Sequence, residues 1–234
     1  MRTHTGRSLK VVTLLLVASL VAAPLAWANA PEDRILPADQ YTSDKAKQLA
    51  ARHARALRDL NRMVYHCLPW LEVQKSSIGF FRPKGATQDD RYLSMRVYIE
   101  QDPSAKFAAM KVEERAGAMF SRYVGPLLRR MAASQPLLAD PALDGFTVIL
   151  EWRKQSARGE RPVHETIAVF LKKATVVEYL AGRAPIGHLA EWAKVMAWDG
   201  ETALGQLRLT AWDDDFVTTH KVANYEADKS VSCR

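Results

Sequence analysis

The residues in this sequence most suited to chemistry are an acidic run and a histidine–glutamate pair that precedes it. Asp213, Asp214 and Asp215 are consecutive and form the least ordinary local feature of the chain. His188 and Glu191 are three residues apart, a spacing that puts two side chains on one face of a helix. Carboxylates together with an imidazole can hold a divalent cation. We therefore consider a metal site formed by Asp213, Asp215, Glu191 and His188.

This metal site depends on how two predicted strands pair. If residues 194–198 and 206–212 form a hairpin, Asp213 lies beside residues 191–193, whereas Asp199 lies at the turn, about 20 Å away. The acidic run lacks the spacing of a calcium-binding loop, and three consecutive acids in a strand cannot all face one way. The alternative is a solvated turn after the strand, in which one aspartate makes a local backbone hydrogen bond.

Other pairs of reactive residues do not define a reaction. His66 and Cys67 are neighbours on a predicted helix, so their side chains point about 100° apart. His164-Glu165 lacks the second histidine of a zinc-protease helix and begins a strand, where we expect a strand-edge pair. His53 lies in an apolar helical stripe and is interpreted as a hydrogen-bonded core residue. Hydrolase and phosphate-binding motifs are absent from the sequence, which therefore predicts no cofactor and leaves any catalytic residue unknown.

The two cysteines, Cys67 and Cys233, are candidates for a disulfide. In an exported protein such a pair is in a compartment where the bond persists. The bond requires Cα atoms within about 7 Å of each other. It would close a long loop, for which the chain-entropy model allows up to about 5 kcal/mol, less any strain. The alternative is two free thiols, with Cys67 buried on its helix and Cys233 loose in the tail.

Two groups of side chains could form binding surfaces. Four arginines lie around the polar side of the first predicted helix: Arg52, Arg55, Arg58 and Arg62. They form either a contact for an anion or a phospholipid, or the solvated outer face that most helices carry. The chain also has six tryptophans, which either belong to the core or form a platform for carbohydrate.

Hydrophobic periodicity predicts the elements that position these residues. Apolar residues at three- and four-residue steps predict helices over 43–67, from 103 to 131 with a kink or break at Gly125-Pro126, and over 174–181 and 186–193. Alternation predicts strands over 73–82, 92–100, 145–153 and 165–172, besides the hairpin, with a loop over 134–144. Short links between strands favour antiparallel pairing. The predicted fold class is α+β, a twisted, mainly antiparallel sheet with helices packed on one or both faces.

The N-terminal residues have the layout of a secretory signal. Three cations precede an uncharged, largely apolar run over 11–23, and small residues follow it. The run is about 20 Å long as a helix, shorter than the roughly 30 Å hydrocarbon core of a membrane. Cleavage after Ala28 leaves Asn29 as the new N-terminus. The alternative cut after Ala30 would place Pro31 at the scissile bond, and proline is a poor substrate there.

The remaining chain is organised as one domain. We expect a cleaved signal peptide over 1–28, an extended segment over 29–42, a single α+β domain over 43–226 and a loose tail over 227–234. The net charge of +7 includes three cations of the signal and no acids, so about +4 remains. This mild charge, without a dense basic tract, does not predict nucleic-acid binding. No later stretch approaches the length of a transmembrane segment.

These features favour a location and leave the activity open. We expect an exported, soluble protein of the periplasmic envelope, with extracellular release as the alternative. Because no motif names a reaction, a non-enzymatic binding or interaction module is favoured, whose partner would be another protein or an envelope component. The alternative is a periplasmic hydrolase whose site is assembled from distant residues.

The signal assignment predicts the N-terminus of the exported protein. Because Pro31 disfavours the later cut, N-terminal sequencing of the mature protein is expected to begin at Asn29. An intact Met1 on a membrane-embedded product would refute the assignment.

Overall fold

The computed structural model describes residues 30–99, 105–154, 163–210 and 233. The helices are α1 (Asp44–Arg52), α2 (Ala54–Cys67), α3 (Ala105–Ala108), α4 (Val112–Met119), α5 (Gly125–Met131), α6 (Gln135–Ala139), α7 (Lys173–Leu180) and α8 (Ile186–Trp192). Two 3-10 turns, η1 (Glu32–Arg34) and η2 (Ala38–Gln40), precede them, and a π-helical turn, η3 (Phe120–Val124), joins α4 to α5. The strands are β1 (Leu71–Val73), β2 (Gly79–Phe81), β3 (Tyr92–Ile99), β4 (Gly145–Arg153), β5 (His164–Lys172), β6 (Lys194–Asp199) and β7 (Thr202–Leu207).

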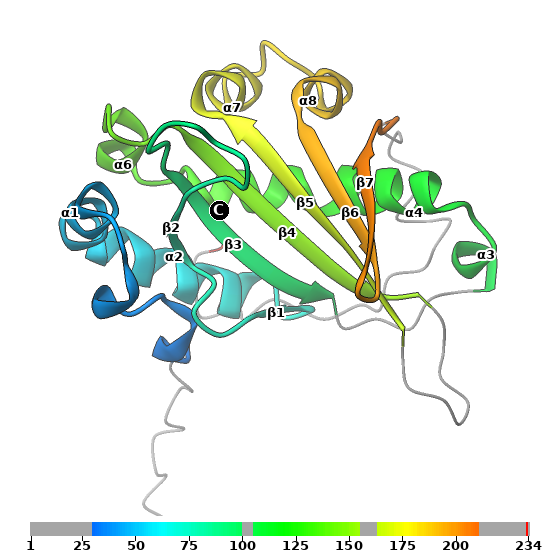
Figure 1. Cartoon of the computed structure of the whole chain (residues 1–234), viewed down its shortest axis with the longest axis horizontal. Coiled ribbons are helices and arrows are strands. Elements are labelled where there is room, and N and C mark those ends of the chain that lie inside the picture. The colour runs from blue at the N-terminus through cyan, green and yellow to red at the C-terminus, as the bar shows by residue number, and fades with distance from the viewer. Residues whose placement is uncertain (1–29, 100–104, 155–162, 211–232, 234) are drawn as a thin grey trace, which may run out of the picture.

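The strands of the described residues form one sheet in the order β1-β3-β4-β5-β6-β7, with β2 beside β1 on the same edge of β3 (Figure 1). The pairing of β3 with β4 is parallel, and the helices from α3 to α6 make the crossover between these strands. All other pairings of these strands are antiparallel. The predicted α+β class with a mainly antiparallel sheet is therefore confirmed.

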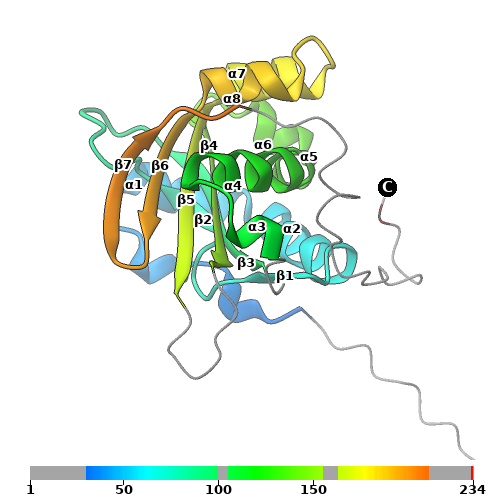
Figure 2. The same cartoon turned by 90° about the vertical axis from the view of Figure 1, so that its right-hand side faces the viewer.

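Helices α2, α4 and α5 cover one face of the sheet (Figure 2). The alternation of the strands directs apolar side chains to that face. In β4 they are Phe146, Val148, Leu150 and Trp152, each at most 2% exposed. They belong to the same core as fully buried residues of the helical layer, including Phe120, Leu127 and Leu128. This core fixes α2 and α5 next to each other on the sheet.

The predicted helix over 43–67 is divided at His53. Helix α1 ends at Arg52, and α2 begins at Ala54, because the His53 backbone leaves the helical region at φ −107° and ψ 18°. The His53 side chain is buried, and its Nε2 lies 2.8 Å from Oδ2 of Asp140. A hydrogen bond to a residue 87 positions away interrupts the helix without disturbing its apolar periodicity. His53 is the hydrogen-bonded core residue that the sequence predicted.

The helix leaves regular α-helical geometry next to Gly125-Pro126, where a kink or break was predicted. The chain stays helical from Val112 to Met131 and passes through the π-helical turn η3 immediately before Gly125. Pro126 is the second residue of α5 and follows the π-helical turn, where the regular α-helical hydrogen-bond pattern is already interrupted. Gly125 is required because a Cβ atom at this position would overlap the hydroxyl of Tyr179 in α7.

The hairpin of β6 and β7 is tighter than predicted. Its turn is at Gly200, which has a φ of +58°, so the second strand begins at Thr202 rather than at residue 206 and ends at Leu207 rather than at residue 212. Gly205, with a φ of +84°, lies where the register shifts instead of in the turn. Either glycine suits a turn, and the sequence alone does not distinguish the turn from the bulge.

Three other boundaries differ from the sequence prediction. The strand expected over 73–82 is two short strands, β1 and β2, separated by a turn in which Ser76 has a φ of +52°. Part of the loop expected over 134–144 is helix α6. Residues 30–42, expected to be extended, contain the turns η1 and η2, and Ile35 forms a bridge with Ile78.

The close packing around Gly145, at the start of β4, predicts that adding one methyl group there lowers the stability of the fold. A Cβ atom at Gly145 would overlap the backbone carbonyl oxygen of Leu171 and the ring of Tyr92. Because the backbone cannot rotate away, Gly145→Ala is expected to lower the free energy of unfolding by about 1–3 kcal/mol in urea titrations. Gly187→Ala in α8 is the matched control. A Cβ atom there meets nothing within 4 Å, so the change should be neutral or stabilise by about 0.5–1 kcal/mol. Equal stability of the two variants would contradict the packing.

Candidate functional site

A groove of about 890 Å³ lies between α2 and the helices α5 and α6. Its α2 wall consists of residues at positions 55, 56, 59, 60 and 63, a spacing that forms one helical face. Its apolar lining comprises Ala56, Leu60, Met63, Pro126, Met131 and Pro136. Its cationic lining comprises Arg52, Arg55, Arg129 and Arg130. The groove is thus lined in part by apolar residues, with Asp59, Ser134 and Gln135 among its polar ones, and it carries arginines from both walls.

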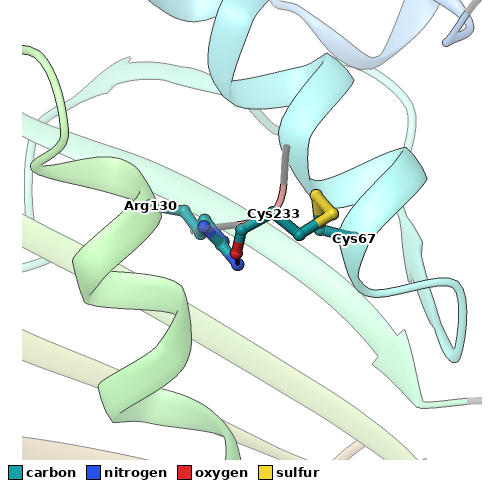
Figure 3. The surroundings of a disulfide bond; sticks show 3 residues. All are labelled: Cys67, Arg130 and Cys233. Carbon is teal, nitrogen blue, oxygen red and sulfur yellow. Dashed lines mark hydrogen bonds between the residues drawn. A yellow bond between two sulfur atoms is a disulfide. The ribbon is translucent and has the colours of Figure 1, made fainter. Parts of the chain in front are cut away.

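Contacts at both ends hold the two walls together. At one end, Nη1 of Arg52 lies 2.5 Å from Oδ2 of Asp140, the residue that follows α6. At the other end, Nη2 of Arg130 donates to the carbonyl oxygen of Cys233 at 2.8 Å, and Cys233 lies against Cys67 (Figure 3). Helix α2 therefore runs antiparallel to the chain from α5 to α6, with the groove between the two fixed ends.

The two cysteines lie at the separation of a disulfide. The sulfur atoms of Cys67 and Cys233 are 2.11 Å apart, and their Cα atoms are 5.5 Å apart, within the limit that the sequence prediction required. The alternative that left Cys233 loose in the tail does not agree with this position. Cys233 is also part of the groove lining, so the pair fixes one end of the candidate site.

Asp140 is the buried anion at the other end of the groove. Its Oδ2 accepts from Arg52 and lies 2.8 Å from Nε2 of His53, and its Oδ1 accepts from the backbone N–H of Ala142 at 2.9 Å. Burial alone would raise the pKa of Asp140. The hydrogen bonds from His53, from the Ala142 N–H and from Arg52 outweigh burial and lower the pKa to about 2. Asp140 is therefore a structural carboxylate, ionised at neutral pH.

The four arginines of the groove differ in how far they are already engaged. Arg52 is bound to Asp140, and Arg130 is bound to the Cys233 carbonyl. The guanidinium of Arg129 lies over the ring of Tyr179, 5.5 Å from its centroid. Arg55 approaches Asp59 only at 3.7 Å, and its side chain is 91% exposed. Arg55 and Arg129 are consequently the arginines best placed to receive a ligand.

The sequence identified part of this site. Among the arginines of its first predicted helix, Arg52 and Arg55 line the groove, whereas Arg58 and Arg62 are exposed outside the set that lines it. Arg129 and Arg130 were not recognised as functional. A local sequence signal cannot show that they face the first helix, because this depends on how two distant helices pack on the sheet.

The predicted metal site is not assembled among the described residues. Asp213 and Asp215 lie outside them, and β7 ends at Leu207, short of the strand that was expected to bring Asp213 close. His188 and Glu191 are exposed on α8, and the His188 ring lies 5.5 Å from that of Trp192. The described part of the chain contains no group of three or more His, Cys, Asp or Glu side chains suited to a metal ion. The metal site remains a prediction, but the strand pairing that was expected to bring Asp213 close to Glu191 is not found.

The pair His164-Glu165 is not a strand-edge pair. Glu165 is only 1% exposed, and its carboxylate accepts from Nε of Arg115 at 2.7 Å and from Nε1 of Trp152 at 3.1 Å. The hydrogen bond to Glu165 raises the pKa of Arg115. The alternation of β5 puts Glu165 on the core face, where an arginine from α4 compensates its charge. This long-range partner could not be read from the sequence.

Comparisons with protein families, with curated proteins and with solved structures found no match for this chain. None of the helices in the described ranges has the length and apolar character needed to cross a membrane. The candidate site therefore rests on its own geometry.

The Asp140 network predicts a pH-dependent stability. Because the folded pKa is depressed, Asp140 stabilises the fold above about pH 4, and this contribution is lost as the pH falls toward 2. We expect Asp140→Asn to lower the free energy of unfolding by about 2 kcal/mol at pH 7, with the difference shrinking toward pH 2.

The measurement is urea unfolding across this pH range. Asp39→Asn is the control, because Asp39 is exposed on η2, and it should change the free energy of unfolding by less than about 0.5 kcal/mol. A pH-independent difference between Asp140→Asn and the parent protein would contradict the assigned role.

Proposed function

We propose that this protein is an exported, non-enzymatic binding module that takes an organic anion with an apolar part into the groove between α2 and α5–α6. The observation that carries the proposal is the composition of the groove: four arginines from the helices α1, α2 and α5 lie around a partly apolar lining. Concave, mainly apolar sites with a few placed polar groups are the usual form of small-molecule sites.

The charges of the groove favour an anion over a neutral ligand. Asp59 is the one acid among the lining residues, against four arginines, and Asp140 behind them is already bound. The planar guanidinium matches carboxylate and phosphate groups with paired hydrogen bonds. A neutral ligand would cover these cations without replacing the water that solvates them.

The proposed location is the periplasm, with extracellular release as the alternative. The positive, apolar and small-residue order of the first 28 residues supports export. The cysteine pair at disulfide distance is compatible with an oxidising compartment. Envelope surfaces carry anionic groups, so an arginine-lined groove suits a ligand or partner from that environment.

The test uses anilinonaphthalene sulfonate, a fluorescent probe that combines a sulfonate with an apolar ring system. We expect saturable binding to the native protein that weakens as salt is added, because screening reduces the attraction of the arginines. The combined change Arg55→Glu and Arg129→Glu is expected to weaken binding about tenfold or more.

Arg58→Glu combined with Arg62→Glu is the matched control, since it reverses two charges of the same helix outside the groove lining. Circular dichroism verifies that every variant is folded. Equal loss of binding in both double variants would indicate general charge attraction, and no saturable binding by the native protein would refute the proposed function.

A further inference from the structure

We infer that the ligand of the groove is a single-chain anionic lipid, whose phosphate or carboxylate head lies on the arginine rim and whose chain follows the apolar lining. This inference rests on the proposed function and specifies the chemical class of the ligand. Its observations are the dimensions of the groove, the chemistry of its walls and the distribution of its charges.

The dimensions suit one chain. The volume of about 890 Å³ is within the range of roughly 300–1,000 Å³ typical of small-molecule sites. The α2 wall from Arg55 to Met63 is about 12 Å long at the rise of an α-helix. A single chain lying along this wall would contact α2 over about two helical turns.

The walls favour an acyl chain over an extended peptide. Both walls are helices, whose backbone N–H and C=O groups are paired within the helix. An extended peptide needs hydrogen-bond partners for its backbone, such as the free edge of a sheet, and this groove offers none along α2 and α5. A hydrocarbon chain needs no such partner. Met63, which is partly exposed, adds a flexible side chain that adapts to an irregular apolar ligand.

The positions of the charged side chains indicate where the anionic head of the lipid binds. Arg55 on one wall and Arg129 on the other are engaged only by a long ion pair and by an aromatic ring. Their paired donors match the oxygens of a phosphate or a carboxylate. Asp59, between Arg55 and Met63 on the α2 wall, disfavours a second negative charge along the chain. The pattern thus fits a ligand with a single anionic end.

The test measures the binding of alkyl phosphates by calorimetry below their micelle-forming concentrations. Over hexyl, octyl, decyl and dodecyl phosphate, affinity is expected to rise up to about fourfold per added methylene until the chain outgrows the groove. Inorganic phosphate supplies the head alone, and octyl glucoside supplies a chain without charge. Both are expected to bind far more weakly than octyl phosphate.

Two variants distinguish the contribution of the lipid head to binding from that of its chain. Arg55→Glu with Arg129→Glu should weaken the whole series about tenfold or more, and Arg58→Glu with Arg62→Glu should not. Met63→Glu places a charge in the apolar lining and should flatten the dependence on chain length. Because Met63 is only partly buried, this variant is expected to keep the circular dichroism of the native protein.

The outcomes distinguish this inference from the proposed function. Binding of anilinonaphthalene sulfonate together with a flat alkyl phosphate series would overturn the lipid assignment and leave an anion-binding groove. Equal affinity for octyl glucoside and octyl phosphate would overturn the role of the arginines. Tighter binding of an acidic amphipathic peptide than of dodecyl phosphate would replace the lipid by a peptide. Loss of both probes would refute the site itself.

Discussion

The arrangement of the groove depends on the buried carboxylate of Asp140. It holds the corner between α1 and α2 through His53 and Arg52, and its backbone carbonyl accepts from Nζ of Lys173 at the start of α7. Asp140 therefore joins the N-terminal helices to the segment before β4 through its carboxylate, and it joins them to the helix that follows β5 through its backbone carbonyl. An ion in such a position is costly to bury, and only the full set of donors makes it favourable. The spacing of the groove walls follows from this junction.

Helices and strands whose conformation depends on neighbouring residues in the sequence could be predicted from the sequence. Strands β4 and β5 agree with the predicted ranges almost residue for residue, because one buried face imposes a strict alternation. The errors occur where a distant residue decides the local conformation. The side chain of His53, at the break between α1 and α2, is bound to Asp140, and Gly125 leaves room for the hydroxyl of Tyr179. The hairpin register was wrong because either of two glycines could have formed the turn.

The candidate site was predictable only in part, for a related reason. The arginines of one helix were visible as a stripe, but a stripe does not reveal whether another helix faces it. Arg129 and Arg130 become part of the site only through the packing of α5 beside α2. Conversely, Glu165 was expected in a strand-edge pair with His164, yet Arg115 and Trp152 compensate its charge in the core. Tertiary compensation of this kind leaves no local pattern.

The pairing of Cys67 with Cys233 has a consequence for the order of events in folding. The two residues are 166 positions apart, and the sheet lies almost entirely between them in the chain. Under the proposed export, Cys67 reaches the oxidising compartment before Cys233 does. In the fold, α2 and Cys233 meet where the elements between them in the sequence have packed into one core. A covalent link between them therefore closes a loop that contains every strand of the described sheet.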